Sequence, residues 1–250
     1  MTRTSLITGA SSGLGAEYAR RGDRLVLVAR NRERLGALAR EFERLGAPEV
    51  EVLAADLSAA DGVDAVCARL TDAARPVDVL VNSAGFGLPL AFERNDIEDE
   101  VRHLRLHVEV PMRQMHAALP GMLERRSGTI LNIASVSAVM PRSTYGALKS
   151  WQVQFSRWAN GAYRGRRVTV TAVCPGYTHT DFHARLGLPR GEQGIADWLW
   201  LEAPRVVEES LRDAERGKAV SVPSKRYKGI WAVSQLAPSG AMARAAAKGR

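Results

Sequence analysis

The chain has 250 residues, of which 46% are hydrophobic and 25% are charged. This composition is typical of a globular protein with a substantial core, and it excludes a disordered or collagen-like chain. The sequence contains no run of about 18 uncharged apolar residues, the length that a membrane-spanning helix needs. We therefore expect no stable membrane insertion.

The formal net charge is +8 at pH 7. Basic residues are interleaved with acidic ones along predicted helices, for example in NRERLGALAREFERLG at 31–46, and such a pattern is typical of a solvated helix face. We therefore expect no nucleic-acid partner. An anionic ligand or cofactor explains the positive charge better.

The two cysteines, Cys67 and Cys174, lie in apolar sequence contexts. Two cysteines are too few for a disulfide framework, so we expect free thiols in a reducing compartment. The N-terminal residues are polar and lead straight into a predicted strand, unlike a secretory signal. Both features predict a cytoplasmic protein.

Seven short apolar runs predict strands, and segments with helical periodicity separate them. The runs lie at 3–8, 24–29, 49–55, 77–82, 128–134, 167–173 and 219–223. A helical face is marked by Leu35, Leu38, Phe42 and Leu45, and another helix is predicted within 59–74. The alternation predicts an α/β fold: a single doubly wound domain with a seven-stranded, mostly parallel sheet and helices on both faces.

The domain is expected to span residues 1–223. The one long irregular stretch, 176–203, predicts a substrate lid at about 177–203, because long loops in compact domains are usually functional. Residues 224–250 are expected to form a C-terminal extension that is partly disordered.

The segment TGASSGLG at 8–15 follows the first predicted strand and opens a helix. Ligands of a doubly wound sheet bind beyond the carboxyl ends of the strands, and glycines there let a pyrophosphate approach the backbone and the helix N-terminus. A nucleotide-binding role is therefore predicted for six residues: Gly9, Ser11, Ser12, Gly13, Leu14 and Gly15.

Two later segments are consistent with the same ligand. ADLS at 55–58 places Asp56 and Leu57 at the end of the third strand, where Asp56 could meet an adenine amino group. NSAG at 82–85 places Asn82, Ala84 and Gly85 under a ribose. Each segment alone is equally well explained as a turn with a local cap.

Arg30 follows the second predicted strand, where an acidic residue would bind the ribose 2′-hydroxyl of NAD. An arginine can bind a 2′-phosphate through two parallel hydrogen bonds, and Ser11, Asn31 and Arg32 are expected nearby. We therefore expect NADP(H) as the cofactor and NAD as the less favoured one. The alternative is an exposed arginine at a helix start.

The ordered motifs identify a family. They are Thr8-Gly9-x-x-x-Gly13-x-Gly15, Asn82-Ser83-Ala84-Gly85, a serine after the fifth strand, Tyr145-x-x-x-Lys149 and Pro175-Gly176. With this set, the chain resembles the classical short-chain dehydrogenase/reductase family over about residues 3 to 223. The resemblance implies a seven-stranded Rossmann sheet and a nicotinamide cofactor. It also implies a homodimer or homotetramer assembled through the helices after strands four and five.

Tyr145 and Lys149 stand four residues apart, so on a helix they share one face. A lysine ammonium beside a phenol favours the phenolate and is expected to lower the pKa of Tyr145 toward neutrality, as suits a general acid and base. Taken alone, such a pair is most often a pair of surface neighbours. The resemblance implies that Lys149 also holds the nicotinamide ribose, and that Ser135, with Ser137 as the alternative, orients the substrate oxygen.

The segment after the sixth strand completes the implied site. The resemblance implies that Pro175 and Gly176 turn the chain toward the nicotinamide. Thr180, with Thr178 as the alternative, is then expected to bind the carboxamide or the phosphates. His179 and His183 lie close by in the sequence, but their spacing does not indicate a metal site.

Two features depart from the family pattern. His107 stands where the family has a catalytic asparagine, whose backbone carbonyl by the family mechanism holds a water that passes protons to the lysine. The relay persists if the helix keeps its distortion, because a backbone carbonyl does not depend on the side chain. The imidazole of His107, with a reference pKa of about 6.5, either takes part in the relay and adds a term to the pH–rate profile, or only fills the position of the asparagine. The first helix is about one turn shorter than in relatives. Because the loss of a whole turn roughly preserves the helix face, Tyr18 and Ala19 can still pack inward. Less surface is buried, so we expect a weaker local structure.

The sequence predicts an NADP(H)-dependent oxidoreductase that transfers a hydride between the cofactor and a carbonyl or secondary alcohol substrate. An apolar substrate is favoured by the large apolar residues of the lid, namely Phe182, Leu186, Leu188, Ile195, Trp198, Leu199, Trp200 and Leu201. The alternative is a cofactor-binding sensor or interaction protein with weak or no catalysis. The short helix and His107 favour that alternative, while Ser135, Tyr145 and Lys149 oppose it.

Overall fold

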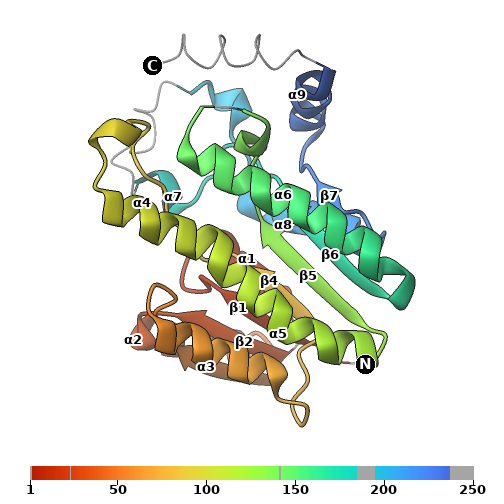
Figure 1. Ribbon diagram of the computed structural model, residues 1–250. Coiled ribbons are helices and arrows are strands. Elements are labelled where there is room, and N and C mark those ends of the chain that lie inside the picture. The colour runs from red at the N-terminus through yellow and green to blue at the C-terminus, as the bar shows by residue number, and fades with distance from the viewer. Residues whose placement is uncertain (1, 23, 141, 185–194, 237–250) are drawn as a thin grey trace.

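A computed structural model describes residues 2–22, 24–140, 142–184 and 195–236 of the chain (Figure 1). Its centre is a seven-stranded sheet in the order β3-β2-β1-β4-β5-β6-β7, and every adjacent pair is parallel. The strands are β1 (Thr4–Thr8), β2 (Arg24–Ala29), β3 (Glu49–Ala54), β4 (Val79–Asn82), β5 (Gly128–Ile133), β6 (Val168–Val173) and β7 (Val220–Ser221). The predicted doubly wound α/β fold is confirmed, with all seven predicted strands in place.

Helices cover both faces of the sheet. They are α1 (Gly13–Ala19), α2 (Arg32–Arg44), α3 (Ala60–Thr71), α4 (Ile97–Leu104), α5 (Val110–Glu124), α6 (Thr144–Tyr163), α7 (Asp181–Ala184), α8 (Ala203–Glu215) and α9 (Lys225–Leu236). A π-helical turn, η2 (Arg105–Glu109), joins α4 to α5. Short 3₁₀ turns are η1 (Phe92–Arg94), η3 (Val136–Val139), η4 (Arg164–Arg166) and η5 (Asp197–Leu199).

The core is divided between the two faces because successive residues of a strand point to opposite sides. On one face, Leu6 packs in a cluster with residues of α3, α5 and α6. On the other face, Ile7 packs with residues of α1, α2 and α8. The strands are consequently apolar on both sides, which is why their sequences read as unbroken apolar runs.

The short helix α1 is packed against α8. Tyr18 and Ala19 are buried as predicted, and the Tyr18 hydroxyl forms a hydrogen bond with the Ser210 hydroxyl of α8. The chain reaches β2 at once, since Gly22 donates to the carbonyl oxygen of Ala19 and packs against Leu25. A helix of seven residues is thus enough to carry the chain from the glycine-rich turn back to the start of β2.

The folded domain extends beyond residue 223. Helix α9 lies inside the region predicted as an extension, yet its Tyr227 is only 3% exposed and packs on Gly176. Residues 237–250, the rest of that predicted extension, lie outside the described part of the chain. None of the helices within the described ranges is long and apolar enough to cross a membrane.

The predicted lid at 177–203 is described in part. Thr178 pairs with Leu201 in an isolated bridge, so both ends of the segment meet at the body of the domain. Of the apolar residues predicted for the lid, Leu201 is buried and Trp198 is 59% exposed. Leu201 therefore packs the segment onto the domain, whereas Trp198 faces outward. Leu186 and Leu188 lie outside the described residues.

Candidate active site

A large cavity of about 1170 Å³ opens at the carboxyl ends of the strands, where doubly wound sheets bind their ligands. Most of the predicted site residues line it: Gly9, Ser11, Ser12, Gly13, Leu14, Arg30, Asp56, Leu57, Ala84, Gly85, His107, Ser135, Tyr145, Lys149, Pro175, Gly176, Thr178 and Thr180. Gly15 and Asn82 are not among the lining residues. The topology thus gathers residues from eight separate sequence segments at one edge of the sheet.

The glycine-rich turn has a backbone conformation that favours residues without a Cβ. Gly9 and Gly13 have φ angles of +68° and +57°, which residues with a Cβ adopt rarely. A Cβ on Gly15 would overlap the carbonyl oxygen of Gly9, so this glycine allows close packing inside the turn and does not face the cavity. The cradle at Gly9 and Gly13 fits the backbone approach that a dinucleotide pyrophosphate requires.

The predicted floor of the site needs one correction. Asn82 is 4% exposed, and its side-chain amide donates a 2.7 Å hydrogen bond to Asn132. It therefore supports the sheet from inside, and its neighbours Ser83, Ala84 and Gly85 line the cavity in its place. The sequence could not separate these residues, because the strand ends within the motif.

Polar groups line the cavity beyond β2 and β3. Arg30, Asn31 and Arg34 all face it. Asn31 also caps α2 by accepting from the backbone N–H of Arg34. Asp56 accepts from the N–H of Ser58 and lines the cavity as well. The local cap is therefore present, and the predicted contact with an adenine amino group stays a prediction.

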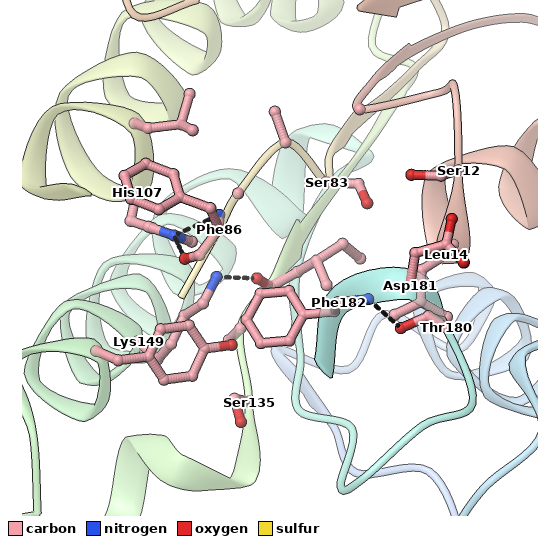
Figure 2. Close-up of a pocket in the computed structure, with 18 of the residues that line it drawn as sticks. Ser12, Leu14, Ser83, Phe86, His107, Ser135, Lys149, Thr180, Asp181 and Phe182 are labelled. Atoms are coloured by element: carbon pink, nitrogen blue, oxygen red, sulfur yellow. Dashed lines mark hydrogen bonds between the residues drawn. The ribbon is translucent and has the colours of Figure 1, made fainter. Parts of the chain in front are cut away.

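Thr180 is better placed than Thr178 to meet a ligand at the glycine-rich turn. A Cβ on Gly13 would lie 3.4 Å from the Thr180 Cβ, and Figure 2 shows Thr180 on the same side as Ser12 and Leu14. The Thr178 hydroxyl instead donates to the carbonyl oxygen of Gly176, 3.0 Å away. Pro175 fixes the start of this segment, because its carbonyl oxygen accepts from the N–H of Val136.

Lys149 is a buried cation on α6. It is 4% exposed, its ammonium donates to the carbonyl oxygen of Ile133 at 2.6 Å, and it lies 5.4 Å from the centre of the Tyr145 ring. Burial lowers the pKa of Lys149 to about 7. A lysine so shifted can exchange a proton near neutral pH.

Tyr145 differs from the sequence-based expectation. Burial raises its pKa above the ordinary value, and the nearby Ser135 hydroxyl lowers it only in part. The expected lowering of the Tyr145 pKa toward neutrality is therefore wrong for this structure, because burial disfavours the charged form of the phenol just as it does that of Lys149. Tyr145 is therefore a neutral phenol in this structure, which is the form that donates a proton in reduction.

Ser135 caps the 3₁₀ turn η3 by accepting from the N–H of Ser137 at 3.1 Å. Figure 2 shows Ser135 in the pocket, below Lys149 and Phe182 in this view. Ser137, the alternative, also lines the cavity.

His107 lies in the π-helical turn η2, so the helix distortion on which the predicted relay depends is present. The residue is 1% exposed. Its Nε2 lies 2.8 Å from the carbonyl oxygen of Phe86, and its ring packs against Gly85. Burial, followed by Lys149 and His103, lowers the pKa of His107 well below its ordinary value. The imidazole is thus neutral near pH 7, which disfavours the predicted term near pH 6.5.

Several residues that line the pocket or pack behind it were not predicted from the sequence. His103 of α4 is fully buried and its ring lies 12° from parallel to that of Tyr145, with centroids 5.9 Å apart. Gln152 binds Lys149 from the next turn of α6. Apolar and aromatic lining residues also come from loops and from α9: Phe86, Met140, Tyr177, Tyr227 and Ile230. The polar residue three positions after Lys149 was the available signal for Gln152, whereas the loop residues carry no periodic pattern.

The described residues contain no group of three or more His, Cys, Asp or Glu side chains placed to hold a metal ion. His179 instead stacks on Trp200, with ring centroids 4.7 Å apart, and its Nε2 lies 3.7 Å from the Glu202 carboxylate. The side chain of His183 lies outside the described residues.

Comparison with known proteins identifies the family. The model of the family described as short chain dehydrogenase matches residues 3–190. The chain belongs to this family. It is an oxidoreductase of the NAD(P)-dependent short-chain type that acts on alcohol and carbonyl groups.

Three relatives show how closely the family is matched. Sulfoacetaldehyde reductase 2 of Chromohalobacter salexigens is 33% identical, over 85% of this chain and 86% of its own. A short-chain dehydrogenase from Sphingobium yanoikuyae in complex with NADPH is 33% identical, with a TM-score of 0.85 and coverage of 96% and 95%. A bulky-bulky ketone specific alcohol dehydrogenase from Comamonas testosteroni is 28% identical, with a TM-score of 0.81 and coverage of 96% and 93%.

Proposed function

We propose that this protein is an NADP(H)-dependent oxidoreductase that interconverts a bulky, apolar ketone or aldehyde and the corresponding alcohol. The observation that carries the proposal is the meeting of Ser135, Tyr145 and Lys149 in one cavity with the glycine-rich turn. A neutral tyrosine can donate the proton that a carbonyl reduction requires, and the Ser135 hydroxyl and the Lys149 side chain, with a pKa of about 7, are placed to support it.

The preference for NADP(H) over NAD(H) rests on the residues after β2. Arg30, Asn31 and Arg34 line the cavity there. Arg30 takes the position at which an acidic residue would bind the ribose 2′-hydroxyl of NAD. A guanidinium can bind a 2′-phosphate through two parallel hydrogen bonds. The NADPH bound to the similar Sphingobium protein supports the same choice.

A bound nicotinamide supplies or accepts the hydride. The chain's own groups then manage the proton: the Tyr145 hydroxyl donates it to the substrate oxygen in reduction and recovers it in oxidation. Ser135 orients that oxygen by hydrogen bonding. Lys149 holds a proton close to Tyr145 and, near its pKa, can release or regain one without a large energetic cost.

The apolar substrate class rests on the lining of the cavity beside Tyr145. Phe182 packs on the Tyr145 ring at a centroid distance of 5.9 Å, and Phe86, Met140, Leu199 and Ile230 also line the cavity. The similar Comamonas enzyme is specific for bulky ketones, while the similar Chromohalobacter enzyme reduces sulfoacetaldehyde.

The test is a substrate panel of bulky aryl ketones, small aldehydes with and without a sulfonate, and polyols, each assayed with NADPH and NADH. We expect the highest kcat/KM for aryl ketones with NADPH. Highest kcat/KM for the sulfonated aldehyde would contradict the apolar class. Absence of turnover with tight NADPH binding would favour the alternative of a cofactor-binding sensor.

We further propose that the protein is cytoplasmic and assembles as a homodimer or homotetramer through α5 and α6. Trp158 and Met112 are exposed on these helices, and Trp158 continues an aromatic stack with Phe155 and Trp151. Exposed large apolar side chains on adjacent helices favour burial against a second copy. Light scattering after size exclusion tests the assembly.

A further inference from the structure

The buried face of α6 carries polar residues where a core helix ordinarily has apolar ones. Tyr145, Lys149, Gln152 and Ser156 are spaced four, three and four residues apart, so they form one stripe. Lys149, Gln152 and Ser156 are all buried, with exposed fractions of 4%, 3% and 0%. Buried polar groups are costly unless each has a hydrogen-bond partner, so the partners of Gln152 are informative.

Both ends of the Gln152 amide are engaged. Its Oε1 accepts from the Lys149 ammonium at 3.1 Å, and its Nε2 donates to the backbone carbonyl oxygen of His107 at 2.9 Å. The carbonyl lies in the π-helical turn η2, where the regular hydrogen-bond ladder is interrupted and a carbonyl can accept from outside the helix. Gln152 thus joins Lys149 to this turn.

The position of Gln152 is fixed from the sheet side. The Ser156 hydroxyl donates to the backbone carbonyl of Gln152 at 2.7 Å and accepts from the side-chain amide of Asn132 at 2.9 Å. Asn132 in turn accepts from Asn82 on the neighbouring strand β4. A buried network of this kind holds its members in one arrangement.

The groups around Lys149 leave the ammonium dependent on neutral acceptors. On its own helix Tyr145 is a neutral phenol. From the turn and α4, His107 and His103 have pKa values lowered mainly by burial. After β6, burial raises the pKa of Cys174 to about 12. The side-chain acceptor that contacts the ammonium is therefore the Gln152 amide, beside the backbone carbonyl of Ile133.

We propose that Gln152 is a positioning residue of the active site. Its amide carbonyl orients the Lys149 ammonium toward Tyr145, and its Nε2 anchors that pair to the His107 carbonyl through one hydrogen bond. The inference rests on the proposed function in so far as Lys149 serves the reaction. The contacts themselves belong to the chain alone, so they can be tested without turnover.

The decisive experiment follows the titration of Lys149 by NMR of protein labelled with ¹³C at the lysine Cε. The chain has only four other lysines, Lys218, Lys225, Lys228 and Lys248, and Lys149→Arg assigns the signal. We expect Lys149 to titrate well below the ordinary lysine pKa of about 10.4. Gln152→Glu places a carboxylate against the ammonium and is expected to raise this pKa by about 1 to 3 units, while Gln152→Met removes an acceptor and lowers it.

Kinetics provide the second readout. In Gln152→Met we expect kcat to fall on the order of 10-fold to 100-fold with little change in KM, because a misoriented proton carrier slows the chemical step more than binding. Gln152→Glu is nearly isosteric and retains an acceptor, so it gives the answer if Gln152→Met does not fold. Gln154→Met and Gln154→Glu, on the exposed side of the same helix, are matched controls.

The outcomes separate the two proposals. Unchanged Lys149 titration in both Gln152 variants, or wild-type kcat in both, overturns the role of Gln152. Absence of turnover in the wild type with every substrate contradicts the proposed function, and the Lys149 titration still decides the role of Gln152.

Discussion

The ring of His107 lies edge-on to the ring of Tyr145, with centroids 5.7 Å apart and planes at 87°. A neutral imidazole fits against the tyrosine in this arrangement without placing a second charge beside Lys149. Burial accounts for the neutrality, since it lowers the pKa of His107 well below the ordinary value. Keeping His107 neutral in the folded state should therefore lower the stability of the fold at acidic pH.

We predict that acid destabilises the wild type more than His107→Asn. Below the unfolded-state pKa of about 6.5, the unfolded chain binds a proton that folded His107 does not, so stability falls as the pH falls, by up to about 1.4 kcal/mol per pH unit. Urea unfolding between about pH 5 and 8 measures the slope. His116→Asn, at an exposed position of α5, is the matched control. Equal slopes in wild type and His107→Asn would show that His107 is not buried as a neutral group.

Ser135→Ala is predicted to lower kcat on the order of 100-fold, because it removes a hydroxyl that favours ionisation of Tyr145 and that we propose orients the substrate oxygen. Ser137→Ala removes the corresponding hydroxyl two residues further along the chain, and its kcat is expected to stay near the wild-type value. A larger loss in Ser137→Ala than in Ser135→Ala would transfer the role to Ser137.

Arg30→Asp is predicted to reverse the cofactor preference. Losing a charge-assisted contact and adding a repulsive carboxylate should weaken NADPH binding on the order of 10-fold to 100-fold and improve NADH binding. Fluorescence titration with each cofactor measures both affinities. Arg40→Asp makes the same charge change on the exposed side of α2 and should alter neither. Wild-type protein that binds NADH as tightly as NADPH would refute the assignment.

Tyr18→Phe is predicted to destabilise the fold by about 1 kcal/mol, because the buried hydrogen bond to Ser210 ties the short α1 to α8. Urea unfolding of Tyr18→Phe, Ser210→Ala and the double variant forms a cycle that isolates the pair. Additive effects in the cycle would mean that the two hydroxyls do not stabilise one another.

The sequence predicted the sheet closely because buried parallel strands leave a direct signal. The run at 24–29 matches β2 residue for residue, and the run at 77–82 begins two residues before β4. The glycine-rich turn and the Tyr145–Lys149 pair were also predictable, because each depends on local spacing.

Long-range packing explains what the sequence did not reveal. Burial sets the pKa values of Tyr145 and Lys149, and burial depends on chain segments far from α6. Similarly, Tyr227 reaches the cavity because α9 folds back over Gly176, a contact across about fifty residues for which the sequence carries no local pattern. The role of Gln152 was not predictable from the sequence, because its partner His107 lies on a different, distant segment of the chain.

The most direct measurement is the oxidation of NADPH by the wild type with a bulky aryl ketone, side by side with Tyr145→Phe. We expect the wild type to turn over, and Tyr145→Phe to bind NADPH with wild-type affinity while losing at least about 100-fold in kcat, since only the proton-donating hydroxyl is removed. Wild-type turnover in Tyr145→Phe would contradict the catalytic role of Tyr145 and the proposed mechanism with it.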